Sequence, residues 1–303
     1  MTECIYYLDR KHYIRFSITI SLYCYKFIST IFNMDCKEKK RNYDNVADTI
    51  KESYKLARIN QTYQFVNSMH EKYSNIDRCD AIWNILEKLN SFTDISDPDC
   101  SFPNMLHALQ TAEMMRKDDL PEWLQLVGLI HDMGKIMYVK GDDETGTGLQ
   151  KQWAIVGDTF IIGCKIPDKI VFPEFNKLSK DSDKPTMNTK LGIYKEHCGL
   201  DNVICSWGHD EYLYRLLIHE KNQNTLPDEA LYIIRFHSLY SYHTYGEYQQ
   251  FVSQRDKDMF KWLKLFNKYD LYSKNDIKID PDECKQYYIN LIKKYFKFAQ
   301  FFY

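Results

Sequence analysis

The stretch LIHDMGK (residues 129–135) places two ionisable side chains where the buried face of an apolar helix should continue. His131 and Asp132 follow directly on the run LVGLI, and Gly134 and Lys135 come next. Burying either group is costly unless it is paired or bound, and a metal ion is one such partner. An ordinary helix end is the alternative, with His131 and Lys135 near the last carbonyl groups and Gly134 as the cap residue. Other parts of the chain must decide between the two.

The composition is that of a globular protein with a substantial core. The chain has 303 residues, of which 44% are hydrophobic and 27% charged, enough for one large domain or two ordinary ones. Glycine and proline are few, at 11 and 8 residues, which favours a mainly α fold. The net charge of -2 gives no electrostatic reason to expect a nucleic acid or an anionic membrane as a partner.

The cysteines indicate a reducing compartment. Their number, 9, is odd, and none are spaced as CxxC, so neither a disulfide framework nor a zinc ribbon is expected. Scattered free thiols are typical of the cytosol, and we therefore expect a cytoplasmic protein.

Residues 13–33 form an apolar segment preceded by basic residues, as in a signal peptide or a membrane anchor. Lys26 interrupts this segment, however, and the charge-free part, 16–25, is much shorter than the roughly 20 residues of a membrane span. We therefore expect no membrane association. Met34 opens an ordinary charged sequence, and our hypothesis is that residues 1–33 are an atypical extension absent from the mature protein. Residues 34–303 would then form a single domain.

Apolar residues at three- and four-residue spacing predict helices along most of the chain. The predicted helices are 43–73, 79–92, 104–117, 121–135, 199–220, 227–243, 255–274 and 282–302. Residues 153–164 (WAIVGDTFIIGC) are predicted to be extended or a strand pair, and polar loops are expected at 94–104, 141–152 and 173–190. The expected fold class is all-α or mainly α, a single helical bundle with a minor short β element.

Five of the predicted helices carry one histidine or aspartate in line with their buried face. These residues are His107, His131, His209, His237 and Asp270. His131 is in register with Leu124 and Val127, for example, and His209 follows Cys205 by four residues. A lone inward histidine is more often a hydrogen-bonded core residue than a metal ligand, so each case is weak alone.

Together these residues predict a metal centre. An inward aspartate such as Asp270 is rare, and helices that bury such groups bring them to a common centre. With Asp132 added, four imidazoles and two carboxylates are too many for one zinc ion, and they suit two six-coordinate metals with one bridging carboxylate. Ligation without thiolate favours iron, manganese or another borderline to hard metal. In the second His-Asp pair, at 209–210, we interpret Asp210 as structural.

Several longer stretches also form a recognisable pattern, among them QWAIVGDTF (152–160), SWGHDEYLY (206–214) and FNKYDLY (266–272). With the spacing H…HD…H…H…D they resemble the HD-domain superfamily and, more specifically, the myo-inositol oxygenase family, from about residue 41 almost to the C-terminus. The resemblance implies a non-haem oxygenase with a mixed-valent Fe(II)/Fe(III) pair. Such an enzyme cleaves the ring of myo-inositol with O2 to give D-glucuronate, with the substrate on one iron and O2 on the other. The implied ligands, with Asp132 bridging, are His107, His131, Asp132, His209, His237 and Asp270.

The resemblance also implies a set of substrate contacts. They are Arg41, Asp94, Ser96, Lys135, Gly157, Asp158, His237 and Ser238, with Lys274 as a further candidate. Carboxylates and hydroxyls suit a neutral polyol, which needs hydrogen-bond partners. Lys135 and Asp132 are expected to be catalytic, Lys135 by stabilising an alkoxide of the substrate. We expect the segment around Arg41 to fold over the pocket as a lid that excludes water.

Two features depart from the family, and neither removes a predicted ligand. Residues 142–148 (DDETGTG) lengthen one loop and are expected to be a tolerated surface insertion, and the apolar N-terminal segment is unusual. The alternative function is that of an HD-type phosphohydrolase with the same metal cage, but Asp94 and Asp158 would repel a phosphate. We expect the enzyme to be a monomer.

Overall fold

The computed structural model describes residues 43, 46–96, 103–272 and 279–303, all within the unit Lys40–Tyr303. The predictions for residues 1–33, Arg41 and Lys274 lie outside the described residues. The α-helices are α2 (Asp48–Asn60), α3 (Tyr63–Lys72), α4 (Ile82–Lys88), α5 (Asn104–Lys117), α6 (Glu122–Ile130), α7 (His209–Ile218), α8 (Asp228–Phe236), α9 (Tyr240–His243), α10 (Gln254–Tyr272) and α11 (Pro281–Tyr295). Short 3₁₀ helices are η1 (Leu89–Ser91), η2 (Met133–Lys140), η3 (Pro173–Leu178), η4 (Lys180–Asp183), η5 (Leu200–Asn202) and η6 (Glu220–Asn222).

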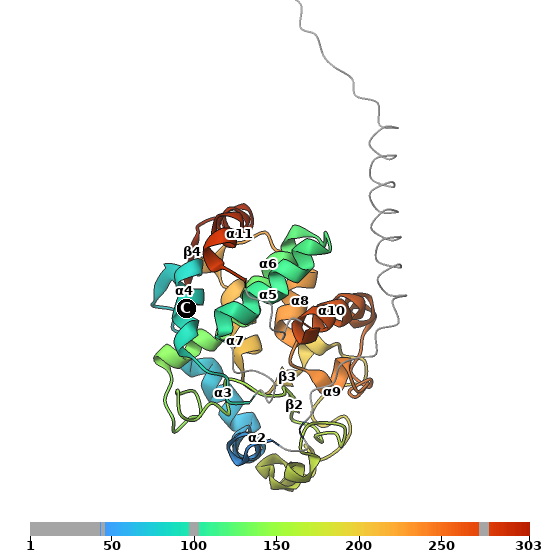
Figure 1. Ribbon diagram of the computed structural model, residues 1–303. Coiled ribbons are helices and arrows are strands. Elements are labelled where there is room, and N and C mark those ends of the chain that lie inside the picture. The colour runs from blue at the N-terminus through green and yellow to red at the C-terminus, as the bar shows by residue number, and fades with distance from the viewer. Residues whose placement is uncertain (1–42, 44–45, 97–102, 273–278) are drawn as a thin grey trace, which may run out of the picture. The chain divides into compact units, whose positions relative to one another are not determined.

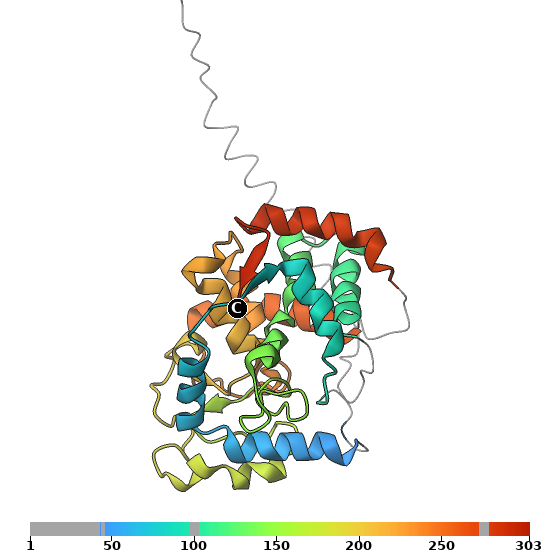
Figure 2. The ribbon, with the colours of Figure 1, turned by 90° about the vertical axis from the view of Figure 1, so that its left-hand side faces the viewer.

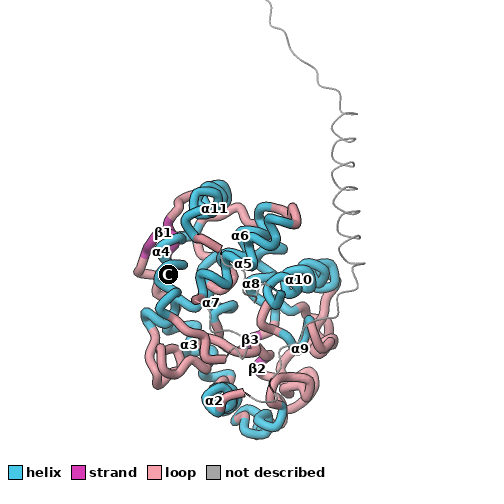
Figure 3. The backbone as a smooth tube through the Cα atoms, in the orientation of Figure 1, coloured by secondary structure: helices cyan, strands magenta, loops and turns pink. Residues whose placement is uncertain are grey.

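The predicted fold class is confirmed, because helices dominate and the strands are short (Figure 3). Strand β1 (Cys79–Ala81) pairs antiparallel with β4 (Gln300–Phe302), and β2 (Ile161–Ile162) pairs antiparallel with β3 (Ile204–Cys205). Among the described residues, no helix combines the length and apolar character needed to cross a membrane.

The core is built around α6, whose residues from Leu124 to Ile130 are all buried. A helix that is apolar on all sides is expected to lie inside a bundle. Helix α5 packs against α6, α10 packs against α8 and α5, and α7 packs against α8 and η2. Helices α2 and α11 lie at opposite ends of this unit, with α5, α6 and α8 between them (Figures 1 and 2).

Several predicted helices are shorter or more divided than expected. The helix predicted for 79–92 begins only at residue 82, that for 121–135 ends at residue 130, and that for 227–243 is divided into α8 and α9. The pattern at 43–73 is broken between α2 and α3, where the Thr62 side chain caps α3 by accepting from Phe65 N. The helix predicted for 199–220 is wrong in its first half, because Ile204 and Cys205 pair with β2 and α7 begins only at residue 209. The helix predicted for 282–302 ends at residue 295, and its last residues form β4 instead.

Residues 142–148, which were predicted to be a surface insertion, are less superficial than predicted. Asp142 is exposed, and its carboxylate accepts a hydrogen bond from Thr145 N (2.7 Å) and one from Lys72 Nζ (2.6 Å). Thr147, in contrast, is fully buried. The loop is therefore a folded turn attached to α3.

Candidate metal centre

The six predicted ligands are brought together mainly by helix ends. His107 lies near the start of α5, His131 directly after α6, Asp132 directly before η2, His209 at the first position of α7, His237 directly after α8 and Asp270 near the end of α10. All six side chains are buried. The expectation that His209 sits four residues along a helix from Cys205 is wrong, because Cys205 is in strand β3.

The first cluster consists of His107, His131 and Asp270. Asp270 Oδ1 lies 2.9 Å from His107 Nε2 and 3.6 Å from His131 Nε2. The ligand atoms of the three residues lie within 4.8 Å of one another, close enough to hold one ion. Tyr240, which sequence reasoning missed, donates its hydroxyl to the other oxygen of Asp270 (3.4 Å).

The second cluster consists of His209 and His237, whose Nε2 atoms are 3.1 Å apart. Asp132 lies between the two clusters. Its Oδ1 is 3.2 Å from His209 Nε2, and its Oδ2 is 3.5 Å from His131 Nε2. One carboxylate therefore faces both groups of histidines, which is the arrangement that a bridging ligand requires.

Three of the four imidazoles are oriented by a backbone carbonyl. The Nδ1 atom of His131 is 2.9 Å from Gly128 O, that of His209 is 2.7 Å from Ile155 O, and that of His237 is 2.9 Å from Ile234 O. Because a carbonyl oxygen only accepts, each Nδ1 carries a proton, and Nε2 is the atom that can bind a metal when the ring is neutral. Metal-binding histidines are commonly fixed in this way. The donor set thus fits metal ions at both clusters.

The carboxylates are held in their charged form. Burial alone would raise the pKa of Asp132, but the charges of Lys135 and His131 hold it well below its ordinary value. The pKa of Asp270 is also well below its ordinary value, because hydrogen bonds with His107 and His131 outweigh burial. Burial lowers the pKa of His237 to about 4. Charged carboxylates and a neutral imidazole are the forms that bind metals.

Gly134 allows η2 and α7 to approach closely. A Cβ atom at this position would lie 2.0 Å from His209 O. Gly134 does not have the positive φ that is typical of a glycine at a helix C-terminus. The interpretation of Gly134 as a cap residue is therefore wrong. Its role is to let the chain after Asp132 pass beside the start of α7.

Lys135 is surrounded by acceptors. Its Nζ donates to Asp132 Oδ2 (2.9 Å), Asp94 Oδ2 (2.9 Å) and Asn104 Oδ1 (3.1 Å). Burial alone would lower the pKa of Lys135, but the charges of Asp132 and Asp94 raise it above its ordinary value. Asp94 Oδ1 accepts from both the N–H and the hydroxyl of Ser96. Four predicted site residues thus form one network, and Asn104, which the sequence did not suggest, belongs to it.

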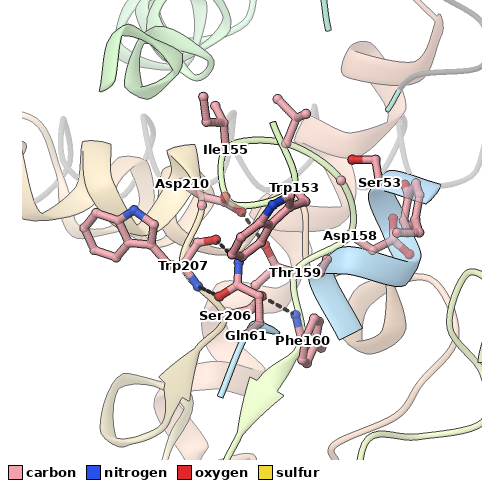
Figure 4. Close-up of a pocket in the computed structure, with 15 residues that line it drawn as sticks. Ser53, Gln61, Trp153, Ile155, Asp158, Thr159, Phe160, Ser206, Trp207 and Asp210 are labelled. Carbon is pink, nitrogen blue, oxygen red and sulfur yellow. Dashed lines mark hydrogen bonds between the residues drawn. The ribbon is translucent and has the colours of Figure 1, made fainter. Parts of the chain in front are cut away.

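The remaining predicted contacts lie near the second cluster. Gly157 has a left-handed φ of 104°, and Asp158 and Ser238 are buried. A pocket beside them is lined by residues of α2 and of the segments 153–160 and 206–210, among them Asp158, Thr159 and Asp210 (Figure 4). Asp158 also faces a buried cation: burial lowers the pKa of Arg58, and the charge of Asp158 opposes this shift.

Comparison with known proteins shows that most of the chain is similar to one family. The model of the family described as "Myo-inositol oxygenase" matches residues 47–301. "Probable inositol oxygenase" of Oryza sativa subsp. japonica is 46% identical over 261 residues, which are 84% of this chain and 82% of that protein. "Inositol oxygenase" of Dictyostelium discoideum is 43% identical (86% and 88%), and "Inositol oxygenase" of Danio rerio is 42% identical (88% and 96%).

Proposed function

Because this chain belongs to the myo-inositol oxygenase family, we propose that it uses O2 to cleave the ring of myo-inositol, with D-glucuronate as the product. The family resemblance predicted from the motifs is confirmed, and with it the prediction that the protein is an oxygenase. The proposal extends from the family to the substrate, the product and a centre of two iron ions.

The observation that carries the proposal is Asp132, whose two oxygens face different groups of buried histidines. Two cations could share this carboxylate, and nitrogen and oxygen ligands without thiolate suit iron. His107, His131 and Asp270 would hold one iron, and His209 and His237 the other. When bound, the irons would supply Lewis-acid polarisation of substrate oxygens and one-electron chemistry with O2.

The two clusters offer different numbers of protein ligands. With Asp132 shared, the first cluster supplies four residues and the second three. A six-coordinate ion in the second cluster would keep more open positions. The predicted substrate residues Gly157, Asp158 and Ser238 lie beside this cluster, and we therefore assign the substrate to it.

Lys135 would stabilise negative charge on the substrate. Its Nζ lies 2.9 Å from Asp132 Oδ2, next to the shared ligand, and is protonated because two carboxylates surround it. A fixed ammonium group that faces a developing alkoxide lowers the cost of removing the hydroxyl proton. Asp94 and Asn104 hold the ammonium group in place, and Asp94, Ser96, Asp158 and Ser238 would bind ring hydroxyls. The proposal also includes Arg41 as a substrate contact and residues 34–303 as the catalytic domain.

The test is oxygen uptake by iron-loaded protein on addition of myo-inositol, with uronate measured in the same sample. We expect one uronate formed for each O2 consumed. Protein that holds two irons per chain and consumes no O2 with myo-inositol would refute the proposal. A panel of phosphomonoesters and phosphodiesters would then test the hydrolase alternative.

A further inference from the structure

The Gly157–Asp158 turn is held between two anchors. Before the turn, Ile155 O accepts hydrogen bonds from His209 N (2.9 Å) and His209 Nδ1 (2.7 Å). After the turn, Thr159 N donates to Ser238 O (2.9 Å). The two ends of the turn are thus attached to the two chain segments that carry the histidines of the second cluster.

Thr159 also joins these two segments through its side chain. Its hydroxyl lies 3.1 Å from Asp210 Oδ2, and since a carboxylate only accepts, the hydroxyl donates. Thr159 is 5% exposed and Asp210 is 2% exposed, so water does not compete for this bond. Asp210 follows His209 directly, and Ser238 follows His237 directly. One buried residue therefore contacts the neighbours of both histidines.

We propose that Thr159 is a positioning residue for the substrate, because its hydroxyl fixes the Gly157–Asp158 turn relative to the second cluster. The inference rests on the proposed function, in which this turn contacts myo-inositol. The structure around the turn supports it: Phe160 O accepts from Ser206 N (2.7 Å), and β2 follows directly. Thr159 is the residue at which this fixed segment meets the turn.

The hydroxyl, rather than the shape of the side chain, is the element to test. Thr159→Val keeps the shape and removes the donor, while Thr159→Ser keeps the donor and removes a methyl group. Loss of the donor would remove the side-chain contact that helps to hold the turn and leave a buried carboxylate oxygen without this partner. We expect the turn to stabilise the bound substrate and the transition state equally. Displacement of the turn then raises KM and leaves kcat nearly unchanged.

Four quantities should be measured on each iron-loaded variant: KM, kcat, the Kd of myo-inositol by anaerobic titration calorimetry, and iron per chain. Without O2 there is no turnover, so calorimetry reports binding alone. For Thr159→Val we expect KM and Kd to rise about tenfold, which corresponds to about 1.4 kcal/mol, with unchanged iron content. Thr159→Ser should remain within about twofold of the parent protein. If the valine variant does not fold, Thr159→Ala replaces it with the same expectation.

Thr147→Val is the matched control. Thr147 is also a fully buried threonine, but its hydroxyl contacts Thr145 Oγ1 (2.8 Å) in the turn beside α3. Its loss should lower the melting temperature and leave KM and Kd unchanged. This separates a general loss of stability from a loss of positioning.

The outcomes distinguish the inference from the proposed function. If the parent protein neither binds nor turns over myo-inositol, the proposed function fails, and the inference fails with it. If the parent binds and Thr159→Val has the same Kd and KM, the inference alone is wrong. Equal losses in Thr159→Val and Thr159→Ser would also overturn it, because the hydroxyl would then not be the cause.

Discussion

Glu211 and Arg235 form a buried ion pair that joins α7 to α8, with Arg235 Nε 2.8 Å from Glu211 Oε2. Glu211 lies two residues after His209, and Arg235 lies two residues before His237. The Nε2 atoms of these histidines are 3.1 Å apart. The ion pair therefore fixes the two helices relative to each other at the level of the second cluster.

Glu211→Gln should destabilise the protein and weaken the second metal position. The substitution keeps the shape but leaves the buried guanidinium of Arg235 with only the partly exposed Asp201 as a counter-charge, at 3.6 Å. Since breaking a buried ion pair costs about 3–5 kcal/mol, we expect a loss at or below this range. Chemical denaturation and iron per chain would measure the two effects. The control is Arg215→Ala: Arg215 also pairs with Glu211, but its side chain is 42% exposed, so we expect a loss below about 1 kcal/mol. Similar losses in both variants would contradict the argument.

Lys135→Met should reduce turnover far more than iron content. The methionine keeps most of the apolar stem and removes the ammonium group, and loss of one charge-stabilising donor typically costs about 100- to 1,000-fold in kcat. Lys140→Met is the control, since Lys140 ends the same helix η2 but contacts Asn75 O (2.7 Å) and Asp77 (2.6 Å). Its turnover should match that of the parent protein. Full activity of Lys135→Met would remove Lys135 from the mechanism.

Gly134→Ala should disturb the metal centre without touching a ligand. The added Cβ atom would lie 2.0 Å from His209 O, so α7 must move away from Asp132. We expect a loss of roughly 1–3 kcal/mol or more, together with lower iron content. Gly246→Asn is the control, because a Cβ at Gly246 meets nothing within 4 Å and asparagine tolerates its left-handed φ. Normal iron content in Gly134→Ala would disprove the steric argument.

Asp270→Asn should abolish iron binding at the first cluster and leave the helical content intact. It removes the negative charge of a carboxylate that faces both His107 and His131. We expect iron affinity to fall more than about 100-fold. Asp256→Asn tests whether any buried aspartate of α10 has this effect. Asp256 accepts hydrogen bonds from Ser253 N (2.7 Å) and Tyr232 Oη (3.1 Å), so its loss should lower stability and spare iron. Circular dichroism and metal analysis give the comparison.

His70 should make stability depend on pH between about 4 and 6.5. Burial, followed by the charge of Arg215, lowers the pKa of His70 to about 4 from 6.5. As the pH falls through this window, the unfolded chain binds a proton that the folded protein does not, and stability decreases. Stability of His70→Gln should therefore fall less steeply below pH 6.5. Denaturation at several pH values measures the slope, and a slope for His70→Gln equal to that of the parent protein would contradict this assignment.

The residues that the sequence predicted best lie inside helices rather than directly beyond their ends. His107 and Asp270 are buried within α5 and α10, as their apolar stripes indicated, because helical periodicity is a local property. Phe266, in the same stripe as Asp270, packs its ring 5.2 Å from that of His131. The metal-site and helix-end interpretations of residues 129–135 are not exclusive: His131 Nδ1 donates to Gly128 O at the end of α6 and leaves Nε2 facing Asp270.

The elements that the sequence did not predict depend on contacts between distant segments. The start of α7 at His209 is set by β pairing of Cys205 with Ile161, which interrupts an otherwise helical apolar pattern. Asn104 and Thr159 are also involved through partners far along the chain, Lys135 and Asp210. Such contacts leave no periodic signal in the sequence around either partner.

His107 and Asp270 are in direct contact in the folded protein but 163 residues apart in the sequence. The first cluster therefore stays incomplete in a growing chain until α10 has been synthesised, whereas all residues of the second cluster precede α10. Under the proposed function, metal loading of the first cluster would come late in biosynthesis, and chains that end before α10 should leave the ribosome without a complete site.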